Sequence, residues 1–202
     1  MGHVGRKLLG FQPARANIVL HSSFAAAGAG NGTDKAIVAG LLAMQPDDPN
    51  IANSFQLAKE ARLNVHFETA DLREAPPNTA VLTLIGERGR TVTVSISSLG
   101  EGRIWINSID GMHTSFTAET PTLIVRHADS PGILAAAASS LTQRGLSITG
   151  LQHYRHHRSD LALGDISIIV IESDRSIGQD VLDDLMLLPG VVRTIYLDLK
   201  EG

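Results

Sequence analysis

One stretch of the sequence places glycines where a backbone could bind an anion. Gly28, Gly30 and Gly32 form a G-x-G-x-G pattern that runs into Thr33 and Asp34, and glycine-rich turns that open helices often bind phosphate. A triphosphate-binding loop needs a Lys followed by Ser or Thr, and a dinucleotide-binding turn needs a differently spaced third glycine. Because neither pattern is present, we favour a loop in which Thr33 caps a helix and Asp34 stabilises its positive end. A ligand site is the alternative.

A second stretch, HADSPGIL at 127–134, joins a predicted strand to a predicted helix. Pro131 suits the first turn of a helix, and Gly132 leaves the backbone open. The free N–H groups of such a turn could bind the carboxylate of an amino acid. A plain connection between a strand and a helix explains the same residues, so the sequence alone leaves both interpretations open.

A third stretch, HYRHHR at 153–158, contains three histidines and suggests a metal site. The surrounding pattern is that of a strand and a turn, where residues three or four apart do not share a face. A solvated hairpin tip is therefore the favoured interpretation. The serines beside His21 lack the G-x-S-x-G turn of a nucleophilic serine, and no stretch resembles a complete active site.

The composition excludes several classes of function. The 202 residues carry 17 basic and 21 acidic groups, and only 4% are aromatic, so neither a basic patch nor a stacking surface for nucleic acid is expected. The sequence has no cysteine, and therefore no thiol nucleophile and no thiolate ligand for zinc or an iron–sulfur cluster. No apolar run is long enough to span a membrane, and we expect a cytoplasmic protein.

The first half of the chain predicts helices followed by strands. A helix ends at Gly10, a strand follows, and helices are expected after Thr33 and over 50–62. Four further strands are expected as an antiparallel meander at 65–70, 80–86, 90–97 and 103–109. This half, residues 1–112, is therefore predicted to be an α+β domain.

The polar stretch that follows predicts a linker at 113–119 and a second domain over 120–202. Its pattern reads strand, helix, strand, strand, helix, strand, which is the βαββαβ order of a ferredoxin-like fold with both helices on one face of a four-stranded antiparallel sheet. We expect Ile169 and Ile171 on the bare face of that sheet. A bare apolar face and open sheet edges predict self-association.

Three stretches resemble a known family: GNGTDKAIVAGLL at 30–42, PPNTAVLTL at 76–84 and PTLIVRHADSPGIL at 121–134. They are similar to the β chain of bacterial iron–sulfur-dependent L-serine dehydratase over essentially the whole sequence. The last eighty or so residues resemble an ACT domain. The first half resembles an allosteric substrate-binding-type domain that is also found in some D-3-phosphoglycerate dehydrogenases.

The resemblance implies a supporting subunit of an enzyme that converts L-serine to pyruvate and ammonia. A 4Fe-4S cluster would be held by cysteines of a separate α chain and would act on the substrate hydroxyl, and this chain would bind no cofactor. The ACT domain would form a homodimer and bind L-serine or a related amino acid. By similarity, the effector site would include Asp129, Ser130, Pro131, Gly132, Ile133 and Leu134. A polar pocket in the first domain would include Asn31, Thr33, Asp34, Asn78 and Thr79.

The sequence departs from the family pattern in three places. Asn31 stands where the family usually has a histidine before Gly-Thr-Asp, and Pro76 stands where it has a histidine before Pro-Asn-Thr. Family β chains also begin with a Pro-Ser-Ser-Ser-His-Thr segment that is thought to reach the active site, and this sequence starts after it. These departures suggest an alternative, a stand-alone amino-acid-binding regulatory module without catalytic activity.

Overall fold

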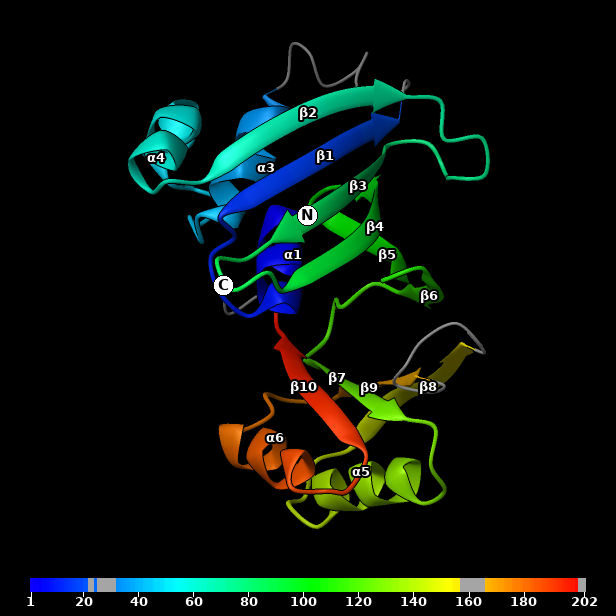
Figure 1. The fold of residues 1–202 in the computed structure, drawn as a ribbon. Helices are drawn as coiled ribbons and strands as arrows, with labels where there is room; N and C mark the ends of the chain where they lie inside the picture. Colours follow the sequence, from blue (N-terminus) through cyan, green and yellow to red (C-terminus); the bar gives the residue numbers. More distant parts are fainter. Residues whose placement is uncertain (22–23, 25–31, 157–165, 200–202) are drawn as a thin grey trace. The chain divides into compact units, whose positions relative to one another are not determined.

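A computed structural model describes residues 1–21, 24, 32–156 and 166–199. The chain divides into two compact units, Met1–Thr117 and Ala118–Gly202, which are treated separately below. Both units combine helices with largely antiparallel sheets (Figure 1), which confirms the predicted α+β class.

Unit 1 is built on a six-stranded sheet. Its helices are α1 (Gly2–Leu9), α3 (Thr33–Leu41), the 3-10 helix η1 (Pro49–Asn53) and α4 (Ser54–Glu60). Its strands are β1 (Arg15–His21), β2 (Asn64–Ala70), β3 (Thr79–Ile85), β4 (Thr91–Gly100), β5 (Arg103–Ile109) and β6 (Met112–Phe116). The strand order is β2-β1-β3-β4-β5-β6. Strands β3, β4 and β5 pair as the predicted meander, and β6 extends it. The expectation that β2 belongs to the meander is wrong, because β2 pairs in parallel with β1 at the edge of the sheet.

Two glycines allow the first helices of unit 1 to cross closely. A Cβ atom on Gly2 would lie 2.0 Å from the carbonyl oxygen of Ile37, and one on Gly40 would lie 2.6 Å from the backbone nitrogen of His3. Helix α1 in turn packs on strands β3 and β4. Helix α1 and the sheet therefore enclose an aliphatic core that includes Val4, Leu8, Leu9, Ile18, Leu82, Leu84, Val94 and Ile96.

Two further predictions for unit 1 are wrong in detail. Thr33 is the first residue of α3, and its expected role as the cap belongs to Gly32, whose φ of 68° is left-handed. Glycine adopts that conformation without the steric penalty of a side chain. The stretch predicted as a linker at 113–119 is in part the strand β6, because the alternating residues Met112, Thr114 and Phe116 are buried and complete the sheet.

Unit 2 has the predicted βαββαβ order. Its elements are β7 (Thr122–Ala128), α5 (Ile133–Thr142), β8 (Ile148–His156), β9 (Ile166–Ser173), α6 (Gln179–Met186) and β10 (Val191–Leu197). All pairings in the sheet, of order β10-β7-β9-β8, are antiparallel. Figure 1 shows α5 and α6 together on one face of the sheet.

The helix-covered face of this sheet carries the core of unit 2. Leu123 and Val125 of β7 lie opposite Ile171 and Ile169 of β9, and all four belong to one buried cluster with side chains of both helices. The expectation that Ile169 and Ile171 face away from the helices is therefore wrong. The side chains of a strand alternate between faces, so their neighbours Ile168 and Val170 point the other way.

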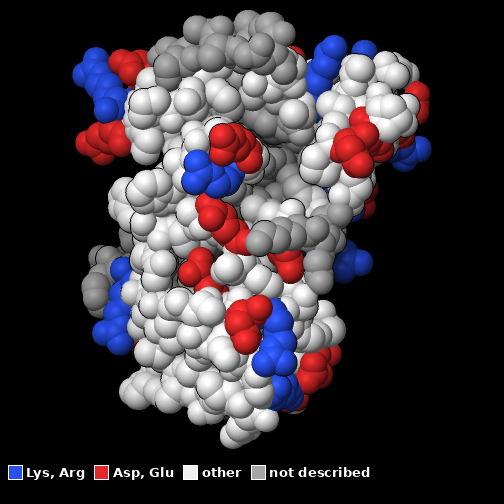
Figure 2. Space-filling model, turned by 180° about the vertical axis from the view of Figure 1, so that it is seen from behind, with Lys and Arg blue, Asp and Glu red and all other residues white. Residues whose placement is uncertain are grey.

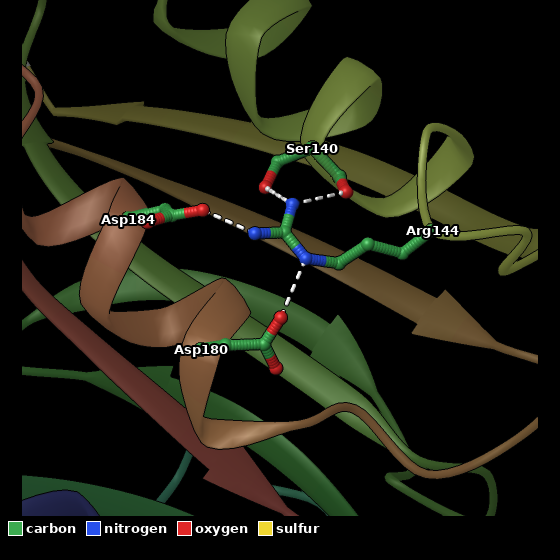
Figure 3. Close-up of polar contacts among 4 residues, drawn as sticks. All are labelled: Ser140, Arg144, Asp180 and Asp184. Carbon is green, nitrogen blue, oxygen red and sulfur yellow. Dashed lines mark hydrogen bonds and ion pairs between the residues drawn. The ribbon is translucent and has the colours of Figure 1, made fainter.

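Helices α5 and α6 are joined by one arginine (Figure 3). Arg144 follows the end of α5, and its Nε donates to Asp180 of α6 at 2.6 Å, while another of its nitrogens donates to Asp184. Its remaining nitrogen donates to the carbonyl and hydroxyl oxygens of Ser140 at 3.0 and 3.1 Å. The guanidinium group therefore links the two helices at the surface of unit 2.

Candidate functional site

The turn between β7 and α5 contains the residues predicted to bind an amino acid. Gly132 caps α5 with a φ of 89°, and no side chain of the described residues bonds the first amides of the helix. The first N–H groups of any helix lack a hydrogen-bond partner within that helix. A side chain at Gly132 would meet no other atom, so the space beside the turn is open. The expected place of Pro131 in the first helical turn is wrong, because it precedes this left-handed cap and α5 begins at Ile133.

A hollow with a volume of about 470 Å³ lies against this turn. It is lined on one side by the turn and the start of α5, and on the other by the segment that leads from α6 into β10. The lining residues are Ser130, Pro131, Gly132, Ile133, Ala136, Leu188, Pro189 and Gly190. Ser130 and Gly132 are exposed, and Leu134 is half-buried on the helix. A small anionic group could reach the free amides from this side.

Asp129, at the start of the turn, pairs with Arg155 of β8, which is separated from β7 by β9. Its carboxylate lies 3.4 Å from Nε of Arg155, and the Asp129 side chain is 21% exposed. The carboxylate is therefore engaged by a cation of its own chain. Of the six residues predicted for an effector site, Asp129 thus ties the turn to the sheet, while Ser130, Pro131, Gly132 and Ile133 line the hollow.

Two histidines lie beside the turn on the helix-covered face of the sheet. His127 of β7 is 1% exposed, and its Nδ1 lies 2.7 Å from the carbonyl oxygen of Ala128. Its ring stacks on that of His153 of β8, with centroids 5.3 Å apart. Burial, followed by the charges of His127 and Arg155, lowers the pKa of His153 below its ordinary value of 6.5, and nearby Asp129 opposes this shift.

The expectation that His153 belongs to a solvated hairpin tip is wrong. Strand β8 continues to His156, which pairs with Ile166, and this register places His153 beside the buried Ile169. His157 and Arg158, the rest of that motif, lie outside the described residues. Residue alternation along β7 was the available signal for this site, because it places His127 on the same face as Leu123 and Val125.

The residues predicted to form a polar pocket in unit 1 lie in two separate pairs in the described part of the chain. Thr79 begins β3 and is fully buried, and its neighbour Asn78 is exposed with a left-handed φ of 56°. Thr33 and Asp34 begin α3 and are half-buried. No hydrogen bond among the described residues joins that pair to Asn78 or Thr79, and Asn31 lies outside the described residues.

The buried hydroxyl of Thr79 belongs to a directed chain of hydrogen bonds. Nδ2 of Asn107 donates to Ser97 at 2.8 Å, the Ser97 and Thr79 hydroxyls are 2.6 Å apart, and Thr79 donates to the carbonyl of Pro76 at 2.6 Å. Thr79 has one proton and gives it to Pro76, so Ser97 must donate to Thr79. Every group between Asn107 and Pro76 is therefore bonded.

A second hollow, of about 510 Å³, lies beside this chain under the 71–76 segment. A row of side chains in register across β3, β4, β5 and β6 forms part of its wall: Val81, Ser95, Ser108 and His113. Asp71, Arg73 and Glu74 contribute charges of both signs. The hollow therefore carries no single dominant charge.

Across the described residues, no three histidine, aspartate or glutamate side chains come close enough to hold a metal ion. No helix in the described part of the chain has the length and apolar character to cross a membrane. On the face shown in Figure 2, basic and acidic side chains are interspersed rather than gathered by sign.

Comparisons with known proteins cover both units. Residues 121–186 match the ACT domain family. A protein of Bacillus subtilis named "Probable L-serine dehydratase, beta chain" is 31% identical over 96% of this chain and 85% of its own length. The "L-serine dehydratase, beta chain" of Peptoniphilus asaccharolyticus is 32% identical over 89% of this chain and 79% of its own length. A D-3-phosphoglycerate dehydrogenase of Methanocaldococcus jannaschii is 22% identical over 74% of this chain, but over only 27% of its own length.

Proposed function

Because the chain belongs to the family of L-serine dehydratase β chains, we propose that it is the regulatory subunit of an enzyme that converts L-serine to pyruvate and ammonia. The observation that carries its regulatory part is the β7–α5 turn of the ACT domain. There, a left-handed Gly132 precedes uncapped helix amides beside an open hollow. The carboxylate of an amino acid is a suitable partner for those amides, since the positive end of the helix dipole favours an anion.

The chemistry of the reaction is assigned to a separate α chain. The resemblance to iron–sulfur-dependent L-serine dehydratase implies a 4Fe-4S cluster, and such clusters are held by thiolates. The 202 residues of this chain contain no cysteine. The residues of this chain therefore do not fit such a cluster, and no catalytic step is derived from them. In this proposal the β chain binds the amino acid, associates with the α chain and changes its activity.

Self-association through the ACT domain is a further part of the proposal. Strands β8 and β10 are the edges of the four-stranded sheet, and edge strands present backbone groups that can pair with another chain. Sedimentation or light scattering of the purified chain should show a dimer. A strict monomer at high concentration would contradict this part alone.

The experiment is anaerobic co-purification with the α chain, followed by a pyruvate assay over a range of L-serine concentrations. The informative variant is Gly132→Ala, because a side chain at a φ of 89° shifts the turn and costs about 1–2 kcal/mol. We expect this variant to keep the complex and lose the response to amino acid. Gly145→Ala is the matched control, since Gly145 lies beyond the other end of α5 with a φ of 70° and open space around it.

A second candidate function is a stand-alone amino-acid-binding module. It is supported by Pro76, which stands at a position where the family has an imidazole and offers Thr79 only a backbone carbonyl. Calorimetric binding of L-serine, without complex formation and without any change in serine deamination by the α chain, would favour this function over the first.

A further inference from the structure

Strand β2 is an open edge of the six-stranded sheet of unit 1 (Figure 1). It has seven residues and pairs with β1 in an unbroken parallel register. The other edge strands of the two sheets, β6, β8 and β10, each have a register shift against their neighbour. Such irregularities, like lysine or proline on an edge, hinder pairing with another chain. Strand β2, with the sequence NVHFETA, has none of these features.

The backbone of β2 offers a regular row of polar groups on its free side. The N–H of Asn64 donates to the carbonyl oxygen of Ala14 at 2.9 Å, so the backbone of Asn64 points to β1. The backbone groups of successive strand residues point to alternate sides. The N–H and C=O groups of Val65, Phe67 and Thr69 therefore point away from the sheet, and no strand in the described part of the chain pairs with them.

The sequence of β2 is complementary to itself about Phe67. If a two-fold axis passes beside Phe67, two copies of β2 run antiparallel, Phe67 faces its own equivalent and Val65 faces Thr69 of the second copy. Residues whose backbone groups point outward then face one another, so all of these groups find hydrogen-bond partners. Between them, His66 faces Glu68 of the second copy, and an imidazole beside a carboxylate is a favourable cross-strand pair.

Other positions of the axis fit less well. An axis beside Glu68 places two carboxylates opposite each other, and like charges at facing positions are destabilising. An axis beside His66 places Thr69 opposite Leu63, which precedes the strand and whose N–H already donates to the carbonyl oxygen of Ala58. The axis beside Phe67 is therefore the register that satisfies both the backbone and the charges.

The side chains of β2 are available for this contact. His66 and Glu68 are 63% and 64% exposed, and Nε2 of His66 lies 3.0 Å from Oε1 of Glu68 within one chain. Two copies would bring two imidazoles and two carboxylates together in alternation. Phe67, on the opposite face, packs against Phe55 of α4 with ring centroids 6.1 Å apart. The second copy would add its own Phe67 to this aromatic pair.

A hollow of about 370 Å³ lies between α4 and the beginning of β2, and Lys59 and Arg62 are among its lining residues. The register about Phe67 carries the segment that follows β2 in the second copy toward this hollow, with Asp71 opposite Leu63. Asp71 is 69% exposed, and its own cation, Arg73, is 4.0 Å away. An acidic side chain of the second copy therefore arrives beside two basic ones.

We propose that the open edge of β2 pairs antiparallel with β2 of a second copy of this chain, which joins the two six-stranded sheets into one. The occupant of the edge is a second copy because the backbone register, the His66–Glu68 pairs and the basic hollow are each complementary to this chain itself. The contact is isologous, since both copies use the same residues. It is separate from the edges of the ACT sheet and does not depend on the proposed function.

Disulfide trapping tests the register directly, because the chain has no cysteine of its own. His66→Cys and Glu68→Cys should be purified separately with tags of different size, and then mixed and oxidised. The Cα atoms of facing residues of this kind are about 4.5 Å apart, which a disulfide can span. The mixture should therefore form a covalent dimer that contains both tags.

Each variant alone should form much less covalent dimer, because residues on the diagonal are about 7–8 Å apart. Asn17→Cys is the matched control, since Asn17 is exposed beside His66 but lies on β1, one strand inside the edge. Mixed with Glu68→Cys, it should form no covalent dimer. Equal cross-linking in all samples, or none in the first mixture, would overturn the proposal.

Sedimentation velocity tests the contact without cysteines. The β2 contact should add species larger than the dimer expected from the ACT domain as the concentration rises. Glu68→Lys places a lysine opposite His66 twice in each symmetric contact, so it should weaken this step by about 2- to 30-fold and leave the dimer. Glu101→Lys makes the same change in charge in the exposed turn between β4 and β5, and it should have no effect.

The same effect of Glu68→Lys and Glu101→Lys would show that net charge alone controls association, and it would overturn the proposal. Cross-linking of His66→Cys or Glu68→Cys to the α chain, and not to a second copy, would show that the edge of β2 receives a strand of the α chain instead. That result would overturn the inference and would leave the proposed subunit function in place.

Discussion

Two clusters of buried hydroxyl groups, one in each unit, differ in their hydrogen bonding. In unit 1, the hydroxyls of Ser97 and Thr79 lie within a chain of bonds that runs from Asn107 to the carbonyl of Pro76. In unit 2, the hydroxyl of Ser167 and the Nε2 atoms of nearby His127 and His153 have no hydrogen-bond partner among the described residues. A satisfied network stabilises a fold, whereas an unsatisfied one lowers stability until something binds it. The comparison therefore assigns a stabilising role to the first cluster and predicts that the second lowers the stability of unit 2.

The largest effect on stability is expected from breaking the chain of hydrogen bonds between Asn107 and Pro76. Thr79→Val removes the hydroxyl that joins Ser97 to Pro76, and it should lower the free energy of unfolding of unit 1 by about 1–2 kcal/mol. The single tryptophan, Trp105, lies on β5 of the same sheet, so its fluorescence during urea unfolding reports on this unit. Thr83→Val is the matched control on the same strand, because its hydroxyl makes only one long contact of 3.4 Å, to Thr93. Equal losses in the two variants would contradict a structural role for the chain of bonds.

The next largest effect is expected in the stability of unit 2 as the pH changes. The pKa of His153 is lowered in the folded chain, chiefly by burial, so the unfolded chain binds a proton at a higher pH than the folded chain does. Stability is therefore complete above the ordinary value of 6.5 and falls as the pH drops below it toward the lowered pKa. Hydrogen exchange of the β7 and β9 amides should accelerate over this range. His153→Phe should remove most of that change, and an unaltered pH profile in this variant would exclude His153 as its source.

Much of the fold could be predicted because its signals are local. Alternating apolar residues locate most of the strands, and glycines end helices where a left-handed residue is required, as at Gly10 and Gly145. The place of β2 at the outer edge, parallel to β1, depends on which strands pair, and no local pattern encodes that choice. Strand β6 was missed for a related reason, since its polar residues alternate with only three buried ones and resemble a linker.

The candidate site shows the same limit more sharply. The β7–α5 turn could be found from Pro131 and Gly132, because turn residues act through their own backbone. The grouping of His127, His153 and Ser167 could not be found, because these residues come from three strands and meet only through the register of β9 with its neighbours. Single histidines in a sequence carry no information about such a meeting, and the HYRHHR stretch at 153–158 favoured a hairpin tip instead.

A smaller effect is expected from the unsatisfied hydroxyl itself. Ser167→Ala removes a buried polar atom that has no partner in the described part of the chain. It should therefore leave the free energy of unfolding of the ligand-free chain unchanged or raise it by up to about 1 kcal/mol. This is the opposite sign to Thr79→Val. Hydrogen exchange of the β9 amides without added amino acid measures it. A loss of stability as large as that of Thr79→Val would show that Ser167 is bonded in the free protein, and it would remove the contrast between the two clusters.

The smallest effect is expected at the exposed arginine that joins α5 to α6. Its hydrogen bond lowers the pKa of Asp180 below the ordinary 3.8, so its contribution to stability is present above that value and is lost as the pH falls through the lowered pKa. Exposed ion pairs are screened by salt and contribute little. Arg144→Met should therefore cause a small decrease in the melting temperature at low ionic strength that disappears at high salt. Arg175→Met is a matched control, because Arg175 pairs with Asp174 rather than with a residue of α6. A fall in stability just below pH 6.5 that is lost in Arg144→Met would contradict the assignment of that fall to His153, since the pKa of Asp180 lies below 3.8.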